Sequence, residues 1–129
     1  MQKFLKSLLG DKMFNNYANF TDRTAVYEGA NSGTREEFLY LSHGLVCEAG
    51  EVGNKIKCFF YDNPPERPGD RESILKECGQ TLWYLTRLIS ALGGTPEQVI
   101  EKNVEEVKER MQNNEATQLV KRAFYTKDR

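Results

Sequence analysis

The most informative helical pattern in the chain is Leu39-Tyr-Leu-Ser-His-Gly-Leu-Val-Cys-Glu48-Ala-Gly-Glu51-Val-Gly-Asn-Lys55-Ile-Lys-Cys-Phe-Phe60. Its large apolar residues recur mainly every three or four positions, which is typical of a helix with one buried face. Glu48 and Glu51 stand three residues apart, so a helix places both carboxylates on the same face. They lie beside the apolar stripe, where a carboxylate is unfavourable unless something pairs with it. The stretch therefore predicts a core helix that carries an acidic site.

The same helix is predicted to begin after Thr34 and to end near Tyr61. Thr34 and Glu37 have the spacing of a capping box, in which each side chain bonds the backbone N–H of the other residue. The helix also contains three glycines, Gly44, Gly50 and Gly53. Each glycine costs about 1 kcal/mol relative to alanine in a helix interior, so their presence indicates close approach by another helix or by a ligand.

A second acidic motif, Glu77-Cys-Gly-Gln80, follows on a second core helix. The segment between the two helices, residues 62–69, holds three prolines and a glycine and is predicted to be a loop. The second helix is expected over roughly residues 71–92, and the glycines at 93 and 94 end it. Two acidic motifs on two core helices suggest one shared divalent-cation site.

A shorter helical pattern precedes this pair. Apolar residues spaced by three and four predict a helix over residues 11–28, which Thr21 and Asp22 can interrupt or recap. Residues 29–33 are predicted to be a loop. Residues 1–10 are too short and too interrupted for a secretory signal and are expected to form an amphipathic arm or a short helix.

The last helical pattern starts at Thr95-Pro96, because a capping threonine followed by proline suits the first helical position. We expect this helix to end near Asn113, where two asparagines break the pattern. Residues 115–126 are then expected to form a short final helix or an arm.

These patterns together predict an all-α fold, because no segment keeps the period-two alternation of a strand. We expect an antiparallel helix bundle of three to four main helices, completed by oligomerisation. The whole chain, residues 1–129, is interpreted as a single domain with a core over about residues 13–112. Residues 1–10 and 113–129 are interpreted as peripheral arms.

Composition narrows the class of partners. The chain has 129 residues, of which 39% are hydrophobic and 29% charged, as in an ordinary soluble globular domain. Its formal net charge of −1 provides no electrostatic attraction to nucleic acid or to an anionic membrane. No apolar run approaches the roughly 20 residues that a membrane span needs. Neither nucleic acid nor a membrane is therefore expected as a partner.

The cysteines and the one histidine form no metal-binding motif. Three cysteines, Cys47, Cys58 and Cys78, are an odd number and contain no Cys-x-x-Cys pair. Reduced thiols packed as small apolar side chains are the interpretation, and a cytosolic location follows. His43 is interpreted as a structural or pocket-lining residue.

Two partners are possible for the acidic positions on spacing alone. Lys55 follows Glu51 by four residues and can form an ion pair with it along the helix. Mg²⁺ or Mn²⁺ is the alternative, because hard cations take carboxylate oxygens and keep coordination positions open for phosphates. The residues leave both possibilities open.

The two acidic motifs belong to a longer set of matching segments. These segments are Arg23-Thr-Ala-Val-Tyr27, Gly44-Leu-x-x-Glu-Ala-Gly-Glu-Val52, Lys55-Ile-Lys57, Glu77-x-x-Gln80, Leu82-Trp-Tyr-Leu85 and Asn103…Arg110. In their order and spacing they resemble the MazG-like all-α nucleoside triphosphate pyrophosphohydrolases, over about residues 13–112. The resemblance implies Mg²⁺-dependent hydrolysis of a (d)NTP at its α–β linkage, which gives (d)NMP and pyrophosphate. It also implies a homodimer or a dimer of dimers.

The resemblance assigns roles to individual residues. It implies that the metal ligands are Glu48, Glu51, Glu77 and Gln80, with the three glutamates acting in catalysis. It implies that the nucleotide-binding residues are Lys55, Trp83, Tyr84, Asn103 and Arg110. The alternative for Trp83 and Tyr84 is ordinary core packing, and the alternative for Arg110 is a place at the subunit interface.

Two positions depart from the family pattern. Gln80 stands where the family has Asp, and Glu106 stands where it usually has Lys. A missing unit charge a few ångströms from a cation corresponds to about 4 kcal/mol at an effective dielectric near 20. Glu106 is one candidate to replace the missing carboxylate. The alternatives to hydrolysis are a catalytically impaired relative that binds nucleotide or regulates a partner, and a helical interaction module without a ligand.

Overall fold

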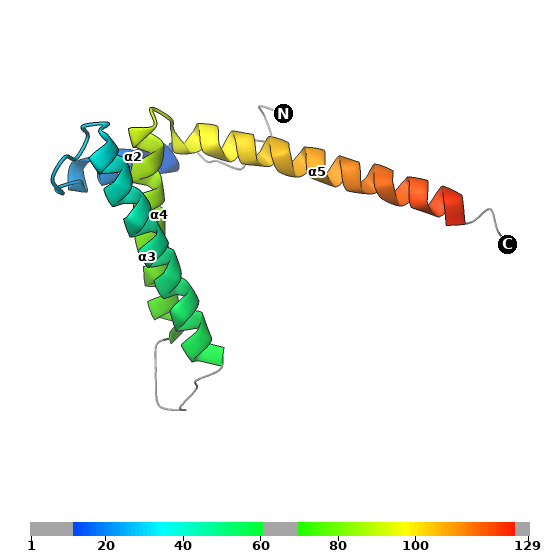
Figure 1. Cartoon of the computed structure of the whole chain (residues 1–129), viewed down its shortest axis with the longest axis horizontal. Helices are drawn as coiled ribbons and strands as arrows, with labels where there is room; N and C mark the ends of the chain where they lie inside the picture. Colours follow the sequence, from blue (N-terminus) through cyan, green and yellow to red (C-terminus); the bar gives the residue numbers. More distant parts are fainter. Residues whose placement is uncertain (1–11, 61–69, 126–129) are drawn as a thin grey trace.

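The computed structural model describes residues 12–60 and 70–125, and the regular elements within them are all helices (Figure 1). In chain order the helices are α2 (Met13–Thr24), α3 (Arg35–Phe60), α4 (Asp70–Ala91) and α5 (Pro96–Tyr125). The all-α prediction is confirmed. None of these helices combines the length and the apolar character needed to cross a membrane.

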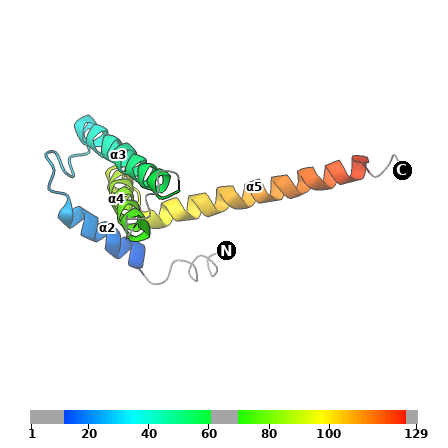
Figure 2. The same cartoon turned by 90° about the horizontal axis from the view of Figure 1, so that it is seen from below.

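The two helices that carry the acidic motifs lie side by side and run antiparallel. Figures 1 and 2 both show α3 and α4 packed along their lengths, with α2 against one end of the pair. The predicted start of α3 after Thr34 and its end near residue 61 agree with the observed bounds. The loop predicted over residues 62–69 lies outside the described residues, as does the predicted arm over residues 1–10.

The body formed by α2, α3 and α4 has a small core in which polar groups occupy central positions. Leu41 is fully buried and Ile89 nearly so, and both face the packed side of the helix pair. Four polar or charged side chains are buried to the same degree: Thr21, Glu37, Thr86 and Arg87. A buried polar group is tolerated when it is hydrogen-bonded, so the partners of these four residues determine the fold.

Glu37 is 1% exposed and binds the loop that precedes its own helix. One carboxylate oxygen accepts hydrogen bonds from the hydroxyl of Tyr27 at 2.7 Å and from the backbone N–H of Asn31 at 2.8 Å. The other oxygen accepts the backbone N–H of Gly33 at 2.7 Å. Burial alone raises the pKa of Glu37, but these hydrogen bonds and the nearby Arg87 outweigh it and hold the pKa below its usual value.

The predicted capping box is therefore only half correct. The hydroxyl of Thr34 accepts the N–H of Glu37 at 3.4 Å, as expected for the N-cap. The Glu37 side chain does not return to the N–H of Thr34, which bonds Ser32 Oγ at 3.3 Å instead. The backbone of Asn31 and Gly33 turns with positive φ angles of 61° and 63°, and this turn brings their N–H groups to the carboxylate.

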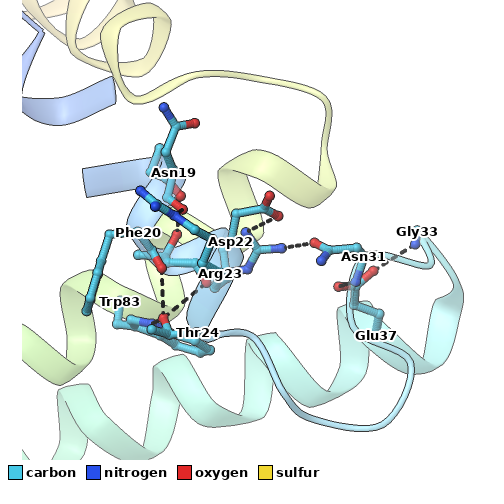
Figure 3. A network of polar contacts seen from close by, with 12 residues as sticks. Asn19, Phe20, Asp22, Arg23, Thr24, Asn31, Gly33, Glu37 and Trp83 are labelled. Carbon is cyan, nitrogen blue, oxygen red and sulfur yellow. Dashed lines mark hydrogen bonds and ion pairs between the residues drawn. The ribbon is translucent and has the colours of Figure 1, made fainter. Parts of the chain in front are cut away.

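Arg87 joins the same loop to α4 and α2. It is 1% exposed, and its guanidinium donates to the side chain of Asn31 and to Asp22 Oδ1, the latter at 3.3 Å. Figure 3 shows Asp22 and Asn31, the two residues that accept these bonds. Among the described residues, Arg87 Nε has no hydrogen-bond partner. The end of α2 and the loop after it are thus tied to α4 through one buried cation.

The helix predicted over residues 11–28 is shorter than expected. It runs through Thr21 and Asp22 and stops at Thr24, after which Ala25 is extended. Thr24 caps the end, because its hydroxyl donates to the carbonyl oxygen of Phe20 at 3.0 Å. The prediction failed because the apolar residues within 25–28 keep helical spacing in the sequence, whereas in the structure residues 25–28 belong to the loop after α2.

The last helix is longer than expected. It begins as predicted, with Thr95 and Gln98 bonding each other's backbone N–H groups at 3.3 and 3.0 Å. The predicted break at Asn113 is wrong, because α5 continues without interruption to Tyr125. Asparagine lowers helix propensity by less than about 1 kcal/mol, and neither glycine nor proline follows to stop the helix.

Only the beginning of α5 packs on the body. Its first turn lies near α2, where Asn15 Nδ2 donates to Glu97 Oε2 at 3.3 Å, and the rest of the helix extends away from α3 and α4 (Figures 1 and 2). The large apolar side chains of α5 that are at least 40% exposed are Val99, Val107, Met111 and Leu119. The helix therefore keeps an apolar surface that one chain does not cover.

Candidate functional site

A cavity of about 340 Å³ lies between the α2–α3 loop and the helix pair. It is lined by Thr24, Val26, Tyr27, Tyr40, Glu48, Gln80, Trp83 and Tyr84. The wall is mainly aromatic, and two polar side chains from the acidic motifs, Glu48 and Gln80, face it. A largely apolar hollow with a few convergent polar groups is the usual form of a small-molecule site.

The four rings form one connected set. Tyr27 stacks on Tyr40 with ring centroids 4.5 Å apart, and Trp83 meets Tyr84 edge to face at 5.1 Å. Trp83 also faces Tyr27 edge-on at 6.3 Å, and its Nε1 donates to the hydroxyl of Thr24 at 3.0 Å. Such a set presents flat apolar faces suited to a planar ring.

Tyr84 approaches the backbone of α3 very closely. A Cβ atom on Gly44 would lie 2.1 Å from Tyr84 Cε1, so no other residue fits there without moving the ring. A hydrogen bond with Tyr40, together with burial, raises the pKa of Tyr84 to about 12. Tyr84 therefore remains a neutral phenol at physiological pH and contributes shape rather than charge.

The two acidic motifs meet next to this cavity. Lys55 Nζ lies 2.5 Å from Glu77 Oε1 and donates a second hydrogen bond to Ser73 Oγ at 2.7 Å. The ion pair therefore joins α3 to α4 and is not the pairing with Glu51 that helical spacing allowed. Of the two partners left open for the acidic positions, the lysine is present, but it pairs with the carboxylate of the opposite helix.

The pKa values of Glu48 and Glu77 move in opposite directions. Burial raises the pKa of Glu48, and the charge of Glu77 and a hydrogen bond with that carboxyl raise it further. The hydrogen bond from Lys55 lowers the pKa of Glu77, with the Lys55 charge adding to this effect. Two carboxyls close together with separated pKa values can share a proton or a cation.

The remaining predicted metal ligands lie at the edge of this pair. Glu51 is exposed on α3, where its charge also raises the pKa of Glu48, and Gln80 is exposed at the cavity. Within residues 12–60 and 70–125, no group of three histidine, cysteine, aspartate or glutamate side chains converges closely enough to hold a metal ion. The ligand set of Glu48, Glu51, Glu77 and Gln80 therefore stays a prediction.

A third carboxylate is not brought to the site from α5. Asn103, Glu106 and Arg110 are exposed on this helix and do not line the cavity. Because α5 extends away from α3 and α4, one chain does not bring them to Glu48 (Figure 1). The roles predicted for Asn103 and Arg110, and the replacement of a missing carboxylate by Glu106, would require a second chain.

Other sequence-based interpretations of single residues need correction. His43 is exposed and does not line the cavity. The three cysteines are free, as predicted, but Cys47 and Cys78 are exposed within one chain instead of packed. Of the three glycines in α3, only Gly44 meets another helix, whereas Gly50 and Gly53 have open space around them.

The sequence patterns missed four residues of the cavity wall. Thr24, Val26, Tyr27 and Tyr40 received no role, although the first three belong to a matched segment, residues 23–27. Tyr27 lies in a predicted helix, so its position opposite Trp83 was not foreseeable from spacing. Tyr40 lies on a predicted core helix, where an aromatic residue is expected to pack. The sequence therefore gives no signal that Tyr40 lines a cavity.

The fold and this site define an all-α protein with an acidic helix pair beside an aromatic cavity. The chain is 33% identical over 89 residues to the Gene 37 protein of Mycobacterium phage L5. The aligned region covers 67% of this chain and 78% of the phage protein. The chain therefore belongs to the family of this phage protein. No protein-family model matches the chain. No solved structure matches it either.

We predict that Gly44→Ala lowers the free energy of unfolding by about 1–3 kcal/mol, because the added methyl group overlaps the Tyr84 ring. Urea unfolding followed by circular dichroism measures the change. Gly53→Ala is the matched control, since nothing lies within 4 Å of its Cβ and the helix gains up to about 1 kcal/mol. Equal stability of Gly44→Ala and the wild type would contradict this packing, and a loss at Gly53 would indicate contact with a second chain.

Proposed function

We propose that the chain is a MazG-like nucleoside triphosphate pyrophosphohydrolase, which hydrolyses a (d)NTP to (d)NMP and pyrophosphate with Mg²⁺ or Mn²⁺. The observation that supports this proposal is the position of Glu48, which contacts Glu77 across the helix pair and also lines the aromatic cavity. A nucleotide needs both surroundings, because its base is flat and apolar while its phosphates are anionic and bind cations.

A divalent cation at this site would require the carboxylates to draw closer together than they lie, and the electrostatics favour that movement. Burial, and then the proximity of Glu77 and Glu51, raises the pKa of Glu48, and a bound cation would offset the repulsion between the carboxylates. Such an ion would neutralise the charge that develops on the phosphates. The carboxylates of Glu48, Glu51 and Glu77, with the amide oxygen of Gln80, are the ligands that we propose.

The chain's own groups have separate tasks in this proposal. Glu48 accepts a proton from the attacking water, and burial raises the pKa of this carboxyl in the direction that suits a proton acceptor. Lys55 lies at Glu77 and can turn to a phosphate as a point charge. Trp83 and Tyr84 supply the stacking surface for the base. Asn103 and Arg110 bind nucleotide or phosphate only if a second chain supplies them.

A second candidate function rests on Gln80. This residue faces the cavity with an uncharged amide where the family pattern has a carboxylate. A site with one charge fewer can bind nucleotide, or regulate a partner, without turning substrate over. A purely structural helical module is the third possibility. For all three we propose a cytosolic location, which the free cysteines favour.

A homo-oligomer, a dimer or a dimer of dimers, belongs to the proposal. Large apolar side chains on the described helix pair are exposed, with Val46 70% and Leu75 61% exposed. Exposed large apolar side chains on packed helices are typical of a surface that a partner covers.

The first test is a pyrophosphate-release assay across the (d)NTPs with Mg²⁺ and with Mn²⁺. We expect turnover by the wild type and a loss of about 10²-fold or more in kcat for Glu48→Gln, Glu51→Gln and Glu77→Gln. Glu36→Gln at the start of α3 is the matched control and keeps full activity, because this side chain is exposed and does not line the cavity.

The same assay separates the candidate functions. A wild type without turnover, together with turnover in Gln80→Asp, would rule out hydrolysis as the native activity and favour nucleotide binding. Absence of any thermal shift with metal or nucleotide would favour the structural module, since a ligand that binds the folded state must stabilise it.

The second test concerns the pH dependence of metal binding. Because the folded pKa of Glu48 is raised, its protonated form favours folding at low pH, and this contribution is lost as the pH rises through that pKa. Mg²⁺ competes with this proton, so the stabilisation by Mg²⁺ should grow over the same pH interval. At about 100 times the Kd it reaches about 2.7 kcal/mol.

Differential scanning fluorimetry at several pH values measures this effect. Glu48→Gln should lose both the Mg²⁺-induced rise in Tm and its pH dependence, whereas Glu36→Gln should keep both. An Mg²⁺ effect that is the same at every pH and in Glu48→Gln would contradict the proposed ligand.

The third test is the mass in solution. Gel filtration with light scattering should give two or four times the chain mass of 14.8 kDa. Val46→Asp, at a side chain that is 70% exposed, should weaken the assembly because it places a charge on apolar surface. A stable wild-type monomer at micromolar concentration would contradict the proposal.

A further inference from the structure

The loop between α2 and α3 forms one wall of the aromatic cavity. Val26 and Tyr27 line the cavity from this loop and Thr24 from the end of α2, whereas Glu48 and Gln80 reach it from α3 and α4. Tyr27 is the ring that links the loop to the helices, because it stacks on Tyr40 and meets Trp83 edge-on. The shape of the cavity therefore depends on where the loop is held.

Glu37 holds this loop from behind the cavity wall. Its carboxylate accepts the hydroxyl of Tyr27 and the backbone N–H groups of Asn31 and Gly33, all within 2.7–2.8 Å. Glu37 itself is 1% exposed and does not line the cavity. Figure 3 shows Asn31, Gly33 and Glu37 grouped at the start of α3, apart from Thr24 and Trp83.

Arg87 fixes the same loop from α4. Its guanidinium bonds the side chain of Asn31 and the carboxylate of Asp22, and it is as deeply buried as Glu37. The loop is therefore held between a buried anion and a buried cation on two different helices. Neither Glu37 nor Arg87 bonds the ion pair of Lys55 and Glu77.

We infer that Glu37 is a positioning residue, which sets the cavity for a planar ligand through Tyr27 and the loop without contacting that ligand. The inference rests on the proposed function for the identity of the ligand, a nucleotide base. The arrangement of the loop in the ligand-free protein does not depend on that proposal.

The chemistry of the carboxylate makes this role specific. An ionised carboxylate is acceptor-only, and here it faces three donors. A glutamine in its place turns an NH₂ group toward at least one backbone N–H in either orientation of the amide. The loop then loses its anchor, and only a fraction of the molecules keeps the complete cavity. The apparent affinity falls by that fraction, whereas the groups on α3 and α4 stay in place.

The experiment compares Glu37→Gln with wild type in two measurements. Acrylamide quenching of Trp83, the only tryptophan, reports the wall of the ligand-free cavity. Steady-state kinetics with the (d)NTP of highest turnover reports KM and kcat separately. We expect stronger quenching and a KM raised about tenfold, with kcat nearly unchanged. This is the result if about one tenth of the molecules keep the complete cavity.

Two further variants serve as control and alternative. Glu36→Gln removes a neighbouring carboxylate that is exposed, and it should leave both measurements at their wild-type values. Asn31→Gly removes the acceptor of Arg87 but tolerates the positive φ of 61°, so it loosens the loop without backbone strain. It should shift quenching and KM in the same direction as Glu37→Gln.

Each outcome supports or overturns the inference. Wild-type quenching and KM in folded Glu37→Gln would overturn it, and so would a loss of kcat without a change in KM. If Glu37→Gln does not fold, Tyr27→Phe, which removes one of the three donors to Glu37 and keeps the ring, decides by the same criteria. If the wild type shows no hydrolysis, the proposed function fails, and the quenching of ligand-free Trp83 still decides whether Glu37 positions the cavity wall.

Discussion

The structure depends on the hydrogen bonds of one buried carboxylate. With Leu41 and Ile89 as its deeply buried apolar residues, the described body cannot rely on hydrophobic packing alone to place the α2–α3 loop. Glu37 supplies the missing specificity, because each of its three hydrogen bonds fixes a different point of that loop. Arg87 completes the arrangement from α4. A buried charge is tolerated here because it is surrounded by donors, and the cost of leaving it unpaired makes the loop conformation unique.

The loop and the helix pair bring two chemically different surfaces together. On one side, Glu48 lies near Glu77 and its pKa is raised; on the other, four aromatic rings line an open cavity. Gly44 allows this proximity, since it lets the Tyr84 ring rest on the backbone of α3. A carboxylate that belongs to both surfaces is the feature that supports nucleotide chemistry. Membership of the family of a mycobacteriophage protein is compatible with this proposal and leaves the activity to experiment.

The chain keeps apolar surface that it does not cover. Val46 on α3, Leu75 on α4 and Met111 on α5 are each more than half exposed, and α5 leads away from the body that carries the site. Asn103 and Arg110 lie on this helix, so any role for them at Glu48 needs another chain. The same physical fact, that α5 packs on the other described helices only near its start, therefore underlies both the proposed oligomer and the separation of Asn103 and Arg110 from the cavity.

The sequence alone determined the helices and the pairing of the acidic motifs. Apolar spacing, the Thr95 cap and the glycines at 93 and 94 are local signals, and local signals fix where α3 begins, where α4 ends and where α5 starts. Tertiary structure decided the rest. Lys55 pairs with Glu77 rather than Glu51, Glu37 binds the loop rather than its own N-cap, and Tyr27 joins the cavity. These choices depend on which groups meet across helices, and periodicity along one helix carries no information about that.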